Sequence, residues 1–125
     1  MDNNEVINLD DADLEKVSGG YFTATEHTVT VTRANYNAVI SSAPSVLIMF
    51  GAHWAGPSVQ LRRTLETVAS ENDNAVIGIV DVDNDEDFCY ELNVRTIPTT
   101  IRFVNGMEVE RIVANQPLDF WMKII

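Results

Sequence analysis

The stretch Ser45–Ser58 (SVLIMFGAHWAGPS) decides the fold of this 125-residue chain. It opens with Ser45–Phe50, a largely apolar run of strand length, typical of a central strand that is covered on both faces. Pro57 suits the first turn of a helix, because its φ is fixed near the helical value and its missing N–H would have no partner there. Leu61, Leu65 and Val68 then share one helix face. The stretch therefore predicts a buried strand, a loop over 51–56 and a helix over Pro57–Glu71.

Similar patterns extend this unit in both directions. Upstream, alternation over His27–Thr32 predicts a strand, and Thr32 could cap a helix over Ala34–Ser42. Downstream we expect a buried strand, a short helix, a hairpin turning at Asn105–Gly106 and a final helix opened by Pro117. These elements span Ala75–Val80, Asp85–Leu92, Thr99–Val104, Glu108–Val113 and 117–125. The order β-α-β-α-β-α-β-β-α predicts an α/β fold with a central mixed sheet and helices on both faces.

Three blocks of sequence give this order a family resemblance. Phe50–Ser58 (FGAHWAGPS) resembles the F-x-A-x-W-C-G-P-C motif of thioredoxins, and Ile97–Thr99 (IPT) resembles their cis-proline motif. Phe103–Gly106 (FVNG) resembles their F-x-N-G hairpin. The blocks stand in the family's order and spacing, and the resemblance covers about residues 25–125. It implies the thioredoxin fold, with a cis peptide bond before Pro98.

The two redox cysteines of that family fall on Ala55 and Ser58. In active members the first cysteine attacks a substrate disulfide from a helix N-terminus, and the second resolves the mixed disulfide. A methyl group has no nucleophile, and a serine hydroxyl lacks the acidity and the exchange chemistry of sulfur. The family's buried acid and its neighbouring lysine would fall on Met49 and Ile79. We therefore expect a chain that is redox-inactive as written and has no catalytic residue.

Two histories fit these replacements. The chain is either a natural non-redox member of the family or a thiol–disulfide oxidoreductase whose cysteines at positions 55 and 58 have been replaced. In both cases a binding surface remains, since the resemblance implies a shallow apolar groove for an extended peptide or protein client. The backbone of Ile97 could pair with such a peptide by strand addition, and no cofactor is expected. The residues that would form the groove are Trp54, Gly56, Pro57, Ile97, Pro98 and Ala114.

Residues 1–20 (MDNNEVINLDDADLEKVSGG) have a different character. Six acidic side chains and one basic one give this segment five of the chain's eleven net negative charges. Four apolar residues fall roughly on one stripe of a helix that Asp10 or Asp11 could cap and Gly19 could end. The segment resembles the double-glycine leader peptides of bacteriocin precursors, which end in Gly–Gly after apolar residues at four fixed positions. The matching residues are Val6, Leu9, Leu14, Val17, Gly19 and Gly20.

The leader resemblance implies an export route. A papain-like peptidase domain fused to an ABC exporter would recognise the leader and cut after Gly20, leaving a thioredoxin-like domain over 21–125. The chain would then be cytoplasmic as a precursor and secreted or extracytoplasmic after cleavage. The alternative is an acidic N-terminal helix with a glycine hinge. A further hypothesis is that the chain serves chiefly as cargo of such a transporter.

Composition excludes several other functions. A net charge of −11 repels phosphate backbones, so we expect no nucleic-acid partner. No apolar run is long enough for a transmembrane segment. Cys89 is the only cysteine and is expected to be a small buried apolar residue, while His53 is expected to be a solvent-facing loop residue. Asp81–Asp87 has alternating acids like a calcium loop, but Glu86 and Leu92 stand where glycine and glutamate are needed, so we expect helix-capping acids and no metal.

Overall fold

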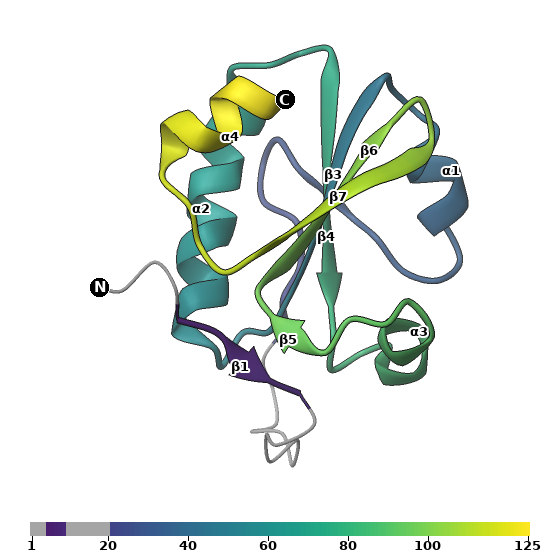
Figure 1. Cartoon of the computed structure of the whole chain (residues 1–125), viewed down its shortest axis with the longest axis vertical. Helices are drawn as coiled ribbons and strands as arrows, with labels where there is room; N and C mark the ends of the chain where they lie inside the picture. Colours follow the sequence, from purple (N-terminus) through teal and green to yellow (C-terminus); the bar gives the residue numbers. More distant parts are fainter. Residues whose placement is uncertain (1–4, 10–20) are drawn as a thin grey trace.

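The computed structural model describes residues 5–9 and 21–125 and has a mixed sheet between two helical layers (Figure 1). Helices α2 and α4 lie on one face of the sheet, and α1 and α3 lie on the other. The helices are α1 Tyr36–Ile40, α2 Gly56–Ser70, α3 Glu86–Glu91 and α4 Leu118–Ile124. The strands are β1 Ile7–Asn8, β2 Val29–Thr30, β3 Ser45–Gly51, β4 Ala75–Asp81, β5 Thr96–Ile97, β6 Thr99–Val104 and β7 Met107–Val113.

The five-stranded sheet has the order β2-β4-β3-β6-β7. Strands β2, β4 and β3 run parallel, whereas β6 and β7 are antiparallel to their neighbours. The hairpin between β6 and β7 turns at Asn105 and Gly106, both with positive φ, as the sequence Asn-Gly favours. The predicted mixed α/β sheet is confirmed, and so is the predicted order of its five strands and the four helices. Strands β1 and β5, which form a separate two-stranded sheet, were not predicted.

Strand β3 is the centre of the core, because both of its faces are covered. Val46, Ile48 and Phe50 belong to the apolar cluster that includes residues of α1 and α3. Leu47 and Met49 belong to the opposite cluster, with α2 and Trp121 of α4. All five of these β3 side chains are fully buried, as the continuous apolar run predicts.

Two predicted boundaries near the start of the domain are wrong. Strand β2 has only two residues, Val29 and Thr30, and α1 begins at Tyr36, two residues later than expected. The residue before α1 is Asn35, whose side-chain oxygen accepts a 2.8 Å hydrogen bond from the Thr32 amide. Thr32 therefore belongs to a turn that precedes the helix.

The helical stripe expected across residues 1–20 is wrong for Val6 and Leu9. The described residues 5–9 include the strand β1, which pairs antiparallel with β5. Pairing with an available strand supplies hydrogen bonds that an isolated helix of this length cannot match in water. The other predicted leader residues, Leu14, Val17, Gly19 and Gly20, lie outside the described residues. Among the described helices, none has the length and apolar character needed to span a membrane.

Candidate functional site

The loop between β3 and α2 carries the motif that decides the fold. Ala55 precedes the helix in an extended conformation, and its carbonyl accepts the first helical bond from the Val59 amide at 3.1 Å. Gly56 and Pro57 form the first turn, so α2 begins one residue earlier than predicted. The indole of Trp54 is half-buried, and Gly56 is exposed. The loop thus places the partly exposed Trp54 and the exposed Gly56 at the N-terminus of a 15-residue helix.

The two positions of the family's cysteines are buried. Ala55 is 1% exposed and Ser58 is fully buried one helical turn further on. The Ser58 Oγ has no hydrogen-bond partner among the described residues. It lies so close to Gly51 that a Cβ there would be 2.8 Å from the oxygen. A nucleophilic serine needs a base within hydrogen-bond reach, so this hydroxyl is not activated for covalent chemistry.

The acids at the end of β4 and in the loop after it bind neighbouring loops, and one of them holds Trp54. Asp83 Oδ2 accepts a 2.8 Å hydrogen bond from the Trp54 indole nitrogen. Asp81 accepts hydrogen bonds from the amide of Phe22 at 3.2 Å and from the amide of Asp83 at 3.0 Å. Burial raises the pKa of the Asp81 carboxyl. Asp85 precedes α3 but makes no side-chain cap, and it accepts from the Arg33 amide at 3.1 Å. The expectation that these acids cap the next helix is wrong, because they bind loop amides and an indole.

The cis-proline loop lies next to the loop that carries Ala114. The peptide bond between Ile97 and Pro98 is cis, which confirms the expectation from the IPT motif. The Pro98 carbonyl accepts a 3.0 Å hydrogen bond from the Ala114 amide. Ala114 has a φ of 73°, so its backbone is in the left-handed region. The structure therefore brings three of the predicted groove residues together.

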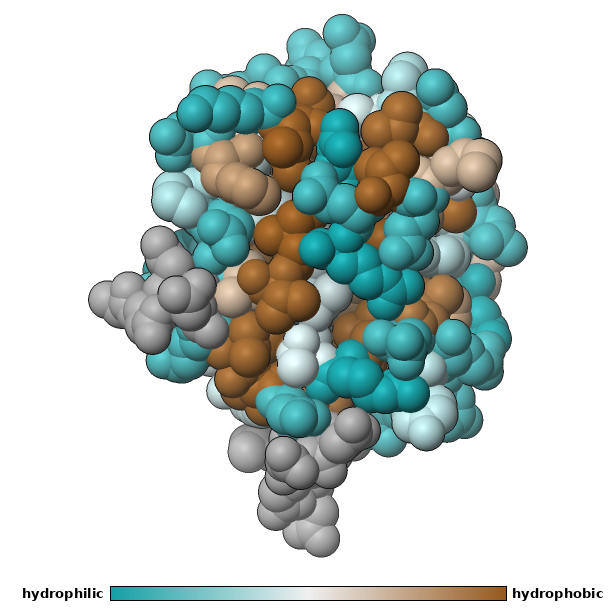
Figure 2. Space-filling view, in the orientation of Figure 1, coloured by the Kyte–Doolittle hydropathy of each residue, from teal (hydrophilic) through white to brown (hydrophobic). Residues whose placement is uncertain are grey.

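The edge of β5 is paired with the chain's own N-terminal segment. Ile7 pairs with Ile97 and Asn8 with Thr96 in antiparallel register, and the Leu9 amide donates a 2.7 Å hydrogen bond to the Arg95 carbonyl. Figure 1 shows β1 alongside β5, and Figure 2 shows apolar residues gathered over this part of the surface. The sequence predicts an external peptide at Ile97, but it has no local pattern that indicates this pairing with the chain's own segment.

The docked segment joins the cluster that also holds the family's first redox position. Ile7, Leu9 and Trp54 are partly buried against the core cluster that contains Ala55 and Ile97. The two sides of the predicted groove, the β3–α2 loop and the cis-proline loop, thus pack in one apolar cluster. The segment 5–9 adds a third component to that cluster.

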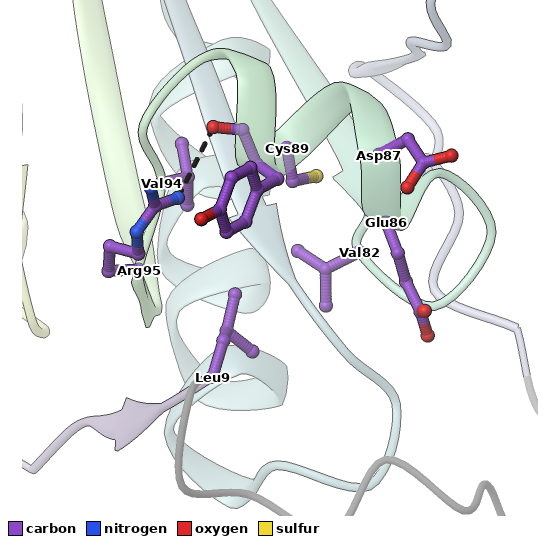
Figure 3. A pocket seen from close by; sticks show the side chains of 8 residues that line it. Leu9, Val82, Glu86, Asp87, Cys89, Val94 and Arg95 are labelled. Atoms are coloured by element: carbon purple, nitrogen blue, oxygen red, sulfur yellow. Dashed lines mark hydrogen bonds between the residues drawn. The ribbon is translucent and has the colours of Figure 1, made fainter.

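A pocket of about 240 Å³ lies beneath α3, next to the docked segment (Figure 3). Leu9 points into this space, toward Val82 and Val94. Its remaining lining residues come from α3 and from the stretch after it: Glu86, Asp87, Cys89, Tyr90 and Arg95. Arg95 stacks on the Tyr90 ring, with its guanidinium carbon 3.9 Å from the ring centroid, and this closes one side. The pocket is therefore apolar at its base and charged at its rim.

The positions of the family's buried acid and lysine are apolar in this chain. Met49 on β3 and Ile79 on β4 are direct partners in the parallel register and are both fully buried. They belong to the apolar cluster beneath α2 and α4. Within the described residues 5–9 and 21–125, the apolar cluster around Met49 and Ile79 contains no acid or base that could carry a proton to position 55 or 58.

The single thiol belongs to the core. Cys89 is free and 2% exposed, and burial raises its pKa to about 12. A thiol held so firmly in its neutral form is a poor nucleophile. The expectation of a small buried apolar residue is therefore confirmed.

Among the described residues, one group could hold a metal ion: Glu26, His27 and Glu66. His27 Nδ1 is within hydrogen-bond distance of a Glu66 oxygen, and the other Glu66 oxygen accepts from the His27 amide at 2.8 Å. This hydrogen bond to Glu66 raises the pKa of His27. An ion pair between the loop before β2 and α2 accounts for the arrangement. His27 is exposed and has a structural partner that the sequence did not indicate.

This arrangement of sheet, helix N-terminus and cis-proline loop defines the chain as a protein of the thioredoxin-fold class. The sequence model for thioredoxin matches residues 27–125. The chain belongs to the thioredoxin family.

Relatives and solved structures of known identity agree with this assignment. The chain is 35% identical over 95 residues to a thioredoxin of Chlamydia caviae, covering 76% of this chain and 92% of that protein. It is 38% identical over 95 residues to a thioredoxin of Chlamydia trachomatis, with the same coverage. The structure of a mutant thioredoxin from Halobacterium salinarum superposes with a TM-score of 0.74 at 30% identity, covering 82% of this chain and 91% of that one.

Proposed function

We propose that this chain is an exported member of the thioredoxin family that binds extended peptides and does not exchange thiols with disulfides. One observation carries the binding proposal: the edge of β5 next to Trp54 and Ala55 pairs with an extended segment, in the register Ile7 to Ile97. Strand addition needs only free backbone groups and suitable side-chain pockets, and neither requires sulfur.

The absence of exchange chemistry follows from the residues at the start of α2. Thiol–disulfide exchange begins with attack by a thiolate, and position 55 carries only a methyl group. The hydroxyl of Ser58 has no base beside it among the described residues, and Cys89 is buried with a raised pKa. None of these groups supplies an attacking sulfur to a client held at β5.

The export part of the proposal rests on the resemblance of residues 1–20 to a double-glycine leader. A peptidase domain of an ABC exporter would recognise Val6, Leu9, Leu14 and Val17 and cut after Gly20. The precursor would be cytoplasmic, and the released domain would act outside the cytoplasm.

Peptide binding can be tested with S-carboxymethylated insulin B chain as the probe, because it is an unfolded chain without free thiols. Titration into the ¹⁵N-labelled full chain should shift the amides of Trp54, Gly56, Ile97 and Ala114. Trp54→Ala should weaken binding, whereas Met107→Ala, at an exposed residue of the edge strand β7, should not. Two outcomes would refute the proposal. One is a set of amide shifts scattered over the whole surface, and the other is the absence of shifts, at a millimolar concentration of the probe, in both the full chain and its Leu9→Asp variant.

The second candidate function is a thiol–disulfide oxidoreductase whose two cysteines have been replaced. The buried Ser58 hydroxyl without a partner favours it, because a sulfur atom would tolerate that apolar site better than a hydroxyl does. The relatives named thioredoxin agree with this alternative but do not decide it. The codons at positions 55 and 58 in the encoding gene separate the two candidates.

A further inference from the structure

We infer that the segment 5–9 is a tethered ligand of the β5 edge, which keeps external peptides out of the groove until it is displaced. This inference rests on the proposed function, since it assigns to the chain's own N-terminus the place that a client would take. It also describes that client: an extended peptide with apolar side chains at alternate positions, like Ile7 and Leu9.

The backbone contacts of β5 show that the segment 5–9 and an external peptide cannot bind this edge at the same time. Among the described residues, strand β5 pairs only with β1, in a two-stranded sheet separate from the five-stranded one. The Arg95 carbonyl already accepts from the Leu9 amide, and Thr96 and Ile97 are paired with Asn8 and Ile7. A client that adds to this edge must use the same groups, because a strand edge pairs with one partner at a time.

The side chains of the segment alternate as a bound strand requires. Ile7 and Leu9 are partly buried against the cluster that holds Ala55 and Ile97, while Asn8 between them is exposed. Residues two apart in a strand point to the same face, so one face of the segment contacts the domain. The contacts are therefore those of a ligand strand.

The second of these side chains forms one wall of the pocket beneath α3. Leu9 lines this pocket together with Val82, Val94 and the helix α3, and its side chain points toward them, as Figure 3 shows. The pocket thus selects an apolar side chain at the position two residues after the one opposite Ile97. An aspartate at position 9 would place a charge on this apolar base, next to Glu86 and Asp87 at the rim.

Because the segment 5–9 is covalently joined to the domain, it can compete with external peptides even if its own affinity for β5 is weak. A ligand joined by a short linker competes at an effective concentration of about a millimolar. If the isolated segment binds with a Kd of about 100 µM, the tethered copy reduces the apparent affinity for any competing peptide about tenfold. Cleavage after Gly20 would remove the tether, so export and opening of the groove would be one event.

Competition in solution tests this inference. The probe is a fluorescein-labelled peptide of residues 3–11 (NNEVINLDD), and its anisotropy is followed with the full chain, with Leu9→Asp and with Ala12→Asp. Leu9→Asp should bind the probe about ten times more tightly than the unmodified chain, because its own segment no longer competes. Ala12→Asp adds the same charge outside the described residues and should bind the probe as the unmodified chain does.

A second variant and a second measurement distinguish release of the segment from unfolding of the domain. Ile7→Asp should have the same effect as Leu9→Asp, and both variants should keep the far-UV circular dichroism of the parent. In both, the amide shifts of Arg95–Ile97 should change before any peptide is added. Equal, saturable binding of the probe by all chains would overturn the inference and leave peptide binding intact. No binding of the probe or of insulin B chain by any of them would overturn both proposals.

Discussion

The indole nitrogen of Trp54 donates a 2.8 Å hydrogen bond to Asp83 Oδ2, so an acid after β4 fixes the aromatic side chain beside position 55. The two residues are 29 positions apart, and the bond connects the two loops that follow neighbouring parallel strands. A groove that binds by shape needs such fixed walls, because ordering a loose side chain costs affinity.

Replacement of Asp83 tests this connection. Asp83→Ala should lower the free energy of unfolding by about 1 kcal/mol, since a partly buried hydrogen bond to a charged acceptor is lost. It should also change the fluorescence of Trp54, while the fully buried Trp121 reports no change. Asp83→Asn keeps an acceptor oxygen and should have a smaller effect in urea denaturation. Equal stability of all three chains would show that the bond does not hold the loop.

Because the hydroxyl of Ser58 is buried, we expect that its removal increases the free energy of unfolding. Ser58→Ala should raise the free energy of unfolding by about 1 kcal/mol, because a buried hydroxyl without a partner carries an uncompensated desolvation penalty. Urea denaturation of the two chains measures this difference. Ser42→Ala is the control, since that exposed hydroxyl donates to the Val39 carbonyl at 2.6 Å and should give no gain. A loss of stability in Ser58→Ala would mean that the hydroxyl is satisfied.

The ion pair between His27 and Glu66 predicts how stability depends on pH. The hydrogen bond to Glu66 raises the pKa of His27 above 6.5, so this contribution is complete below pH 6.5 and is lost as the pH rises through the raised pKa. Burial pushes the pKa of Glu66 up, but hydrogen bonds from Thr25 and His27 outweigh it and bring it below 4.5. That contribution is present above pH 4.5 and is lost as the pH falls. The ion pair between His27 and Glu66 therefore stabilises the fold most between pH 4.5 and pH 6.5.

Thermal denaturation between pH 5 and pH 9 checks this expectation. Tm should fall above pH 6.5 in the unmodified chain, and the fall should be smaller in His27→Gln and in Glu66→Gln. Glu71→Gln changes an exposed acid that follows α2 and should keep the original slope. An unchanged slope in both pair variants would show that other groups set the pH dependence.

Most of the fold could be predicted from local patterns, but the site could be predicted only in part. The apolar run of β3 and the proline in the first turn of α2 determine the central unit, and Ile97-Pro98-Thr99 marks the cis-proline loop. The strand β1 could not be predicted, because its two residues, Ile7 and Asn8, pair with residues that lie 90 and 88 positions further along the chain. Val6 and Leu9, which flank this strand, also fit a helical stripe, and only the available edge of β5 decides between the two structures. The bonds of Asp83 and His27 are likewise tertiary and leave no local pattern.

Cysteines placed at positions 55 and 58 test whether the rest of the site can still support thiol–disulfide exchange. The chain as written should not reduce insulin in the presence of dithiothreitol beyond the rate of the reductant alone. The double variant Ala55→Cys/Ser58→Cys should reduce it measurably, since both positions lie at the N-terminus of α2, where a thiolate is favoured. Met49 and Ile79 provide no proton carrier, so the variant should remain slower than a thioredoxin that has the family's buried acid. Turnover by the unmodified chain would show that its chemistry lies elsewhere.

If residues 1–20 act as a double-glycine leader, as we propose, a peptidase should make a single cut that depends on the apolar residues of the segment. A purified peptidase domain from a double-glycine exporter should cleave the full chain between Gly20 and Tyr21, and mass spectrometry identifies the product. Leu14→Asp should slow cleavage about 10- to 100-fold, because burying a leucine contributes about 1.5–3 kcal/mol and an aspartate loses that contribution. Ala12→Asp adds the same charge at a position outside the apolar set and should be cut at the original rate. Cleavage at another bond, or equal rates for Leu14→Asp and Ala12→Asp, would contradict the leader assignment while leaving the groove and its tethered segment to be judged by their own experiments.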